Sequence, residues 1–238
     1  MKYAFKKYKP VPTSLEFLIY IVIGYFSNQL FQYQTSYFSD TITHINIIDQ
    51  YVSDSFFIPH PGFHILTYLL AKISGLSYVK VVPVIMVSTL LITLYLTKKI
   101  LKDLIPNLSV TAIYFTAAVS ISIMTAIYYP WFSKQIYIGQ WGPNIWHSPT
   151  MTLLKPFALF SFWGMLVIIE KKDQIIFSRA ALVSGLLLAS TFIKPSFIIC
   201  FIPALAVFLI IFHFKDYRIY FQCFLILLPS LLLLAYQF

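Results

Sequence analysis

The sequence predicts an all-α protein, a polytopic bundle of about seven transmembrane helices with amphipathic helices at the outer membrane surface. Of its 238 residues, 59% are hydrophobic and only 11% are charged, and the mean hydropathy is +0.80. A soluble domain carries roughly twice that share of charged residues. The apolar residues also gather in runs near the ~20 residues that a helix needs to cross a bilayer. These observations exclude an ordinary soluble domain and a nucleic-acid-binding protein, and they predict contact with the lipid bilayer.

The apolar runs give the predicted crossings in chain order. The first run follows four lysines near the N-terminus, is longer than the core of a signal peptide and lacks a small-residue cleavage site. Six more runs follow, separated by short polar or charged segments. We therefore treat residues 1–238 as one membrane domain with crossings at about 15–34, 79–97, 109–129, 151–169, 178–193, 197–213 and 219–237.

The basic residues indicate the orientation of these crossings. Most of the 17 Lys and Arg residues fall around residues 2–9, 98–102, 171–179 and 215–218, all on one side of the predicted membrane. Because Lys and Arg collect in cytoplasmic loops, we place the N-terminus in the cytoplasm. We expect an integral protein of a bacterial plasma membrane.

Two longer segments then lie outside, at 35–78 and 130–150. The first contains the run 61–74, which is too short to span and is predicted to lie at the interface as a helix. Isoleucines at helical spacing behind a Ser39 cap predict an amphipathic surface helix over 40–52. Because long loops tend to carry function, we expect any chemistry to face away from the cytoplasm.

Asp40 is the candidate general base of the first outer segment. It is one of three outer carboxylates, with Asp49 and Asp54. A carboxylate that is partly desolvated at a membrane surface is a better base. On the predicted helix, Asp40 and His44 lie one turn apart on the same face. The alternative is that Asp40 only caps the helix, or is solvated beside the positive end of its dipole.

Three histidines, His44, His60 and His64, share this segment with Asp40. Together they offer the ligand types of a divalent metal site, but the run lacks an HExxH signature. The alternative is that the histidines bind lipid head groups or loop carbonyls. We expect neither a metal nor another cofactor.

The second outer segment contains Asn144, Trp146 and His147 after a Gly-Pro turn signal. Aromatic faces stack on sugar rings, and Asn and His bind hydroxyl groups, so these residues are candidates for a sugar-binding edge. The alternative is an aromatic belt at the membrane interface, which needs no ligand.

Lys194 lies between two apolar runs, directly before Pro195. A cation inside the membrane or at its rim often marks a site for an anionic partner. The alternative is a snorkelling side chain whose ammonium reaches the outer head groups.

Five short motifs follow one another along the chain, namely Asp40, His60-Pro61-Gly62-Phe63, Lys72-Ile73-Ser74-Gly75, Lys98-Lys99 and Lys194-Pro195. Their order resembles the GT-C membrane glycosyltransferases, such as the protein O-mannosyltransferases and the aminoarabinose transferases that act on lipid A. The resemblance covers most of the chain, and it is compatible either with such an enzyme or with the N-terminal membrane half of one. Gly62 stands where the family often has the second proline of an HPP motif.

The resemblance implies that a sugar is moved with inversion from a polyprenyl-phosphate carrier to a hydroxyl acceptor on the outer face. The acceptor would be an unknown glycan, lipid or protein. The family's first-loop base carries over to Asp40, the histidine of its HP segment to His60, and its basic residue near the carrier phosphate to Lys194. Such a leaving group needs its charge neutralised, which an outer lysine can do.

Three alternatives stay open. One is a non-catalytic polytopic membrane protein, either transporter-like or an assembly subunit. Another is an inactive fragment of a GT-C enzyme. A third, a polysaccharide polymerase or ligase that uses the same carriers, is disfavoured because no arginine falls on the predicted outer side.

Overall fold

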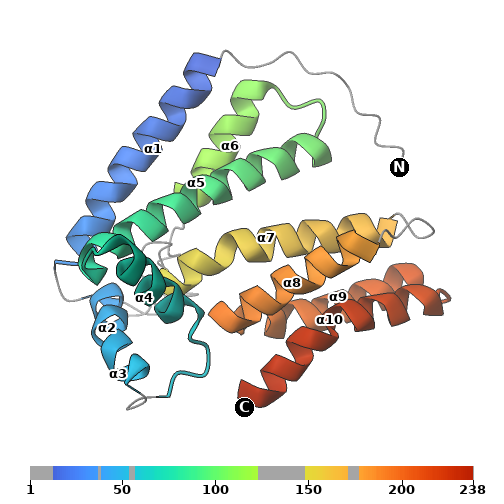
Figure 1. The fold of residues 1–238 in the computed structure, drawn as a ribbon. Helices are drawn as coiled ribbons and strands as arrows, with labels where there is room; N and C mark the ends of the chain where they lie inside the picture. Colours follow the sequence, from blue (N-terminus) through green and yellow to red (C-terminus); the bar gives the residue numbers. More distant parts are fainter. Residues whose placement is uncertain (1–12, 37–38, 54–56, 123–147, 171–176, 238) are drawn as a thin grey trace, which may run out of the picture. The chain divides into compact units, whose positions relative to one another are not determined.

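The computed structural model of the chain is all-α in the residues it describes, which are 13–36, 39–53, 57–122, 148–170 and 177–237 (Figure 1). Its helices are α1 (Thr13–Gln34), α2 (Asp40–Asn46), α3 (Ile48–Val52), α4 (Gly62–Ser74), α5 (Tyr78–Leu104), α6 (Val110–Ser122), α7 (Pro149–Glu170), α8 (Phe177–Ile193), α9 (Ser196–His213) and α10 (Tyr217–Gln237). The chain divides into two compact units, one of Met1–Ile47 with Thr67–Thr152 and the other of Ile48–Leu66 with Leu153–Phe238.

Four helices of the described chain, α5, α7, α9 and α10, are long and apolar enough to cross a membrane. They suggest an integral membrane protein. Large apolar side chains on their surfaces are exposed, as lipid-facing residues are. Each of the four also carries one internal proline, which membrane helices tolerate better than soluble ones; these are Pro83, Pro156, Pro203 and Pro229.

The count of four corrects the seven crossings predicted from the sequence. The run at 15–34 does form α1, of 22 residues, but a polar Ser-Asn-Gln sequence at 27–29 lowers its hydropathy. The run at 109–129 is represented by α6, whose 13 described residues are too few, and 123–129 lie outside the described residues. The run at 178–193 forms α8, whose 17 residues fall just short of a crossing.

In the first unit, α1 and α6 both pack on α5 (Figure 1). Phe31 of α1, Leu90 and Leu94 of α5 and Ala117 of α6 are fully buried there. The hydroxyl of Thr89 donates to the carbonyl of Ile85 at 2.7 Å, so this buried polar group is satisfied within its own helix.

Both segments predicted as short helices are helical, one as a single helix and the other divided in two. The run at 61–74 forms α4, and Gly75 ends it with a φ of +69°, a conformation that favours glycine. The segment predicted as one helix over 40–52 is two, because the backbone N–H of Ile47 turns back to the carbonyl of Ile45 and ends α2 before α3 begins.

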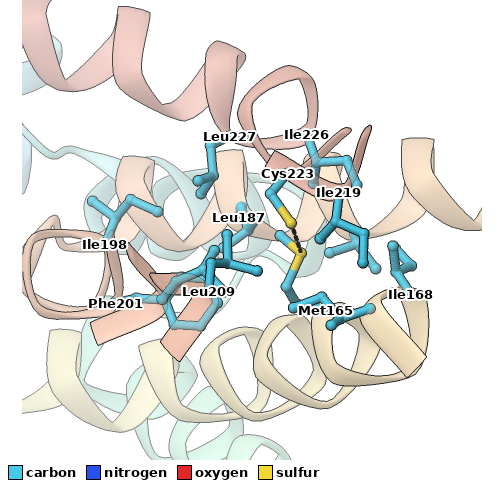
Figure 2. Packing of buried hydrophobic residues seen from close by; sticks show 13 residues of the cluster. Met165, Ile168, Leu187, Ile198, Phe201, Leu209, Ile219, Cys223, Ile226 and Leu227 are labelled. Atoms are coloured by element: carbon cyan, nitrogen blue, oxygen red, sulfur yellow. Dashed lines mark hydrogen bonds between the residues drawn. The ribbon is translucent and has the colours of Figure 1, made fainter. Parts of the chain in front are cut away.

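In the second unit, α7 to α10 share one hydrophobic core (Figure 2). Met165, Leu187, Ile198 and Cys223 are buried at its centre, and the Cys223 Sγ points to the Met165 Sδ at 3.9 Å. The helices approach closely at Gly164, where an added Cβ would lie 2.5 Å from a methyl carbon of Val183. Small residues at such contacts are typical of helix packing in membranes.

Candidate functional site

Lys194 occupies the break between two apolar helices of the second unit. α8 ends at Ile193, the backbone N–H of Lys194 donates to the carbonyl of Ser190 at 2.9 Å, and α9 starts only at Ser196. Pro195 lacks an N–H, so it cannot continue the hydrogen bonding of α8. The Lys194 side chain is half-buried. Lys194 therefore lies in the short turn just before α9, next to the positive end of the α9 helix dipole.

The segment His60-Pro61-Gly62-Phe63 packs on this break. A Cβ on Gly62 would lie 2.9 Å from the Cα and 3.1 Å from the backbone nitrogen of Ile193, so only glycine permits the approach. Pro61, Gly62 and Phe63 are buried, and His60 is half-buried. Gly62 therefore allows this segment to lie against the residue that precedes Lys194.

Two further polar side chains belong to this part of the second unit. His64, in the first turn of α4, is 1% exposed, and its ring lies edge-on to that of Phe63, with 5.6 Å between the ring centroids. Gln237, at the end of α10, donates from Nε2 to the carbonyl of Thr191 at 3.4 Å, while its Oε1 is buried without a hydrogen-bond partner among the described residues. We call this end of the unit, where α8 stops and α9 begins, the Lys194 end.

Asp40 and His44 form a pair in the first unit. The Oδ2 of Asp40 lies 3.5 Å from the Nε2 of His44, one turn along α2, with side chains 33% and 20% exposed. The predicted cap is confirmed, because the Ser39 Oγ accepts from the Ile42 N–H at 3.2 Å. The same hydroxyl donates to the carbonyl of Gln34 at 2.6 Å and so fixes α2 to the end of α1. The result is a partly shielded carboxylate with an imidazole beside it.

The Asp40 carboxylate is suited to act as a general base, and the His44 imidazole is placed to orient it. A carboxylate that takes a proton from a hydroxyl must be held within hydrogen-bonding reach of it. The cap on α2 holds the start of the helix in place, and the His44 imidazole lies beside the Asp40 side chain. The predicted substrate residues are thus divided between the units, with His44 in the first and His60 and Lys194 in the second.

The sequence prediction missed an ionic cluster in the first unit. The Lys98 ammonium of α5 contacts the Glu16 carboxylate of α1 and donates to the Tyr114 hydroxyl of α6 at 3.1 Å. The rings of Tyr95 and Tyr114 lie 5.4 and 5.0 Å from the Lys98 Nζ, within cation–π range. The signal in the sequence was Glu16, a lone carboxylate in an apolar run, because such a group requires a cation nearby.

The remaining predicted residues, Asn144, Trp146 and His147, lie outside the described residues. Within the part of the chain that is described, no three His, Cys, Asp or Glu side chains gather in a way that could hold a metal ion. No protein-family model, characterised protein or solved structure matches the chain.

Proposed function

We propose that the chain is a membrane glycosyltransferase of the GT-C kind. It takes a sugar from a polyprenyl-phosphate carrier and passes it, with inversion, to a hydroxyl acceptor on the outer side of the membrane. The observation that carries the proposal is the contact of Gly62 with the backbone of Ile193. This contact joins two motifs that carry the resemblance, the His60 segment and the Lys194 turn, and the resemblance places the second of them near the carrier phosphate.

Lys194 neutralises the carrier phosphate in this proposal. The donor is a phosphodiester, and cleavage of its sugar–oxygen bond leaves a second negative charge on the phosphate. A half-buried ammonium at a helix break favours that charge, because an ion pair is stronger where water is partly excluded. The start of α9 at Ser196 adds the positive end of a helix dipole.

Asp40 is the proposed base. The acceptor hydroxyl gives its proton to the Asp40 carboxylate while its oxygen forms the bond to the sugar carbon, and the bond from that carbon to the phosphate oxygen breaks. One displacement of this kind inverts the sugar carbon and needs a single base. The nearby His44 imidazole orients the carboxylate and accepts its proton afterwards.

The proposed orientation places the N-terminus in the cytoplasm. The contact between Glu16 and Lys98 supports this, since it brings the start of α1 and the end of α5, both rich in nearby lysines, to the same side. Reporter fusions after Ser148 and after Lys172 should therefore give signals from opposite faces of the membrane. Signals from one face would contradict the orientation.

The first test is native mass spectrometry of the gently solubilised protein, with Lys194→Ala beside the wild type. We expect a co-purifying polyprenyl-phosphate lipid whose mass names the sugar and which is lost in the variant. The matched control is Lys215→Ala, an exposed lysine at the opposite end of α9. Ordinary phospholipid alone on the wild type, together with a stable partner chain, would favour a non-catalytic assembly subunit instead.

A further inference from the structure

We propose that the turn between α9 and α10 is a binding site for an anionic phospholipid of the bilayer, whose phosphodiester is held by Lys215 and Arg218. α9 ends at His213 and α10 starts at Tyr217, so the turn joins two helices that are long and apolar enough to cross a membrane (Figure 1). It lies at the opposite end of α9 from the Lys194 end. The site is therefore separate from the proposed transferase chemistry and does not depend on it.

The surface of this turn is hollowed. A shallow depression of about 800 Å³ is lined by the consecutive residues 211–218, which include both cations. The side chains of Lys215 and Arg218 are exposed. The volume is ample for a phosphodiester head group, since sites for small molecules measure about 300–1,000 Å³. The depression brings the two cations to one surface that a single ligand can reach.

The lining of this depression carries two cations and one carboxylate, that of Asp216. The Oδ1 of Asp216 accepts from the backbone N–H of Ile219 at 3.4 Å, so this carboxylate caps the start of α10 beside the positive end of its dipole. The lining therefore keeps a net positive charge. The other described Asp, Glu, Lys and Arg residues of the second unit are not among the lining residues; these are Asp49, Lys155, Glu170, Arg179 and Lys194.

Large apolar side chains adjoin the two cations. Ile211, Phe212, Phe214 and Tyr217 all line the same depression and are 66–81% exposed. Exposed aromatic and basic side chains together are typical of the membrane interface, where rings reach the upper acyl chains and cations reach the head groups. A phospholipid meets both needs, because its phosphate pairs with the cations while its acyl chains cover the apolar side chains.

The charge of the lining favours an anionic lipid over a zwitterionic one. The fork of Arg218 can donate two parallel hydrogen bonds to the phosphodiester oxygens, and Lys215 adds a point charge. A choline head group would bring its own cation close to both. In the orientation proposed above, the turn faces the cytoplasmic leaflet, whose anionic lipids attract basic residues next to membrane helices.

The test is a binding titration of the full chain in detergent, with short-chain phosphatidylglycerol as the probe and phosphatidylcholine of the same chain length as its zwitterionic counterpart. The variants are Lys215→Gln, Arg218→Gln and the double variant. Lys99→Gln, an exposed lysine of the first unit, is the matched control. We expect each single variant to weaken phosphatidylglycerol binding about fivefold. The double variant should bind it no better than phosphatidylcholine, and Lys99→Gln should bind like the wild type.

A further variant, Lys215→Arg, separates loss of charge from misfolding, because it keeps the cation and should bind within about twofold of the wild type. Equal binding of the two lipids by the wild type, or equal weakening by Lys99→Gln, would overturn the site. Displacement of the probe by an equal concentration of inorganic phosphate would assign the depression to a free anion and overturn the lipid. None of these results bears on the carrier, whose loss is scored separately in Lys194→Ala.

Discussion

Gly62 contacts the backbone of Ile193 so closely that a single added carbon would lie 2.9 Å from the Ile193 Cα. The two residues are far apart in the sequence, and each adjoins a motif that the sequence marks for function. Because the obstacle is backbone rather than a flexible side chain, it cannot be relieved by a rotamer change. The contact therefore fixes where the His60 segment sits with respect to the Lys194 turn.

Gly62→Ala should destabilise the protein by about 1–3 kcal/mol, the usual cost of forcing an extra carbon into a packed site. The matched control is Gly185→Ala in the middle of α8, where an added Cβ meets nothing within 4 Å. That change should be neutral or slightly stabilising, because alanine favours a helix. Thermal unfolding in detergent checks both variants, and equal melting temperatures for the two would contradict the close contact.

Gly164 offers a second packing test with a built-in rescue. An added Cβ would lie 2.5 Å from the Cγ2 of Val183, so Gly164→Ala should destabilise the contact between α7 and α8. Val183→Ala removes the obstructing carbon, and the double variant should be more stable than the sum of the single effects by at least about 0.5 kcal/mol. Strictly additive melting temperatures would show that these residues do not touch.

The helical segments were predictable because apolar periodicity and turn residues act locally. The run at 61–74 and the cap at Ser39 appear where the sequence places them. The number of crossings was not predictable in the same way, since α1 is long enough but too polar and α8 is one turn short of a typical span. Hydrophobic runs show where helices form better than they show which of them cross.

The candidate site was predictable only in its residue types. Asp40 with His44 followed from helical spacing, and Lys194 followed from being a cation among apolar residues. In the sequence, Gly62 is only a departure from a motif. Its packing role was not predictable, because it depends on a contact with a residue more than a hundred positions away. Contacts between distant segments leave no local signal, which is also why the partner of Glu16 was not foreseen.

The Glu16–Lys98 pair should stabilise the first unit modestly. Both side chains keep some exposure, 33% and 17%, so water screens the pair in part. Glu16→Gln should lower the free energy of unfolding by about 1 kcal/mol, or the melting temperature by roughly a few degrees. Lys99→Gln, the exposed neighbour, is the control and should have no effect. If the exchanged pair, Glu16→Lys with Lys98→Glu, were no more stable than either single variant, the ion pair would not be the cause.

The carboxylate of Asp40 should be required for transfer and dispensable for folding. Asp40→Asn keeps the shape and can still accept a hydrogen bond, but it cannot take a proton at neutral pH, so turnover should fall by about 10²–10⁴-fold. Asp49→Asn, an exposed carboxylate on α3, is the matched control and should transfer sugar at the wild-type rate. The measurement is release of polyprenyl phosphate from a sugar-linked carrier in proteoliposomes, with melting temperatures recorded beside it. Wild-type turnover by Asp40→Asn would remove this residue from the mechanism, whereas equal losses in both variants would indicate a general charge effect.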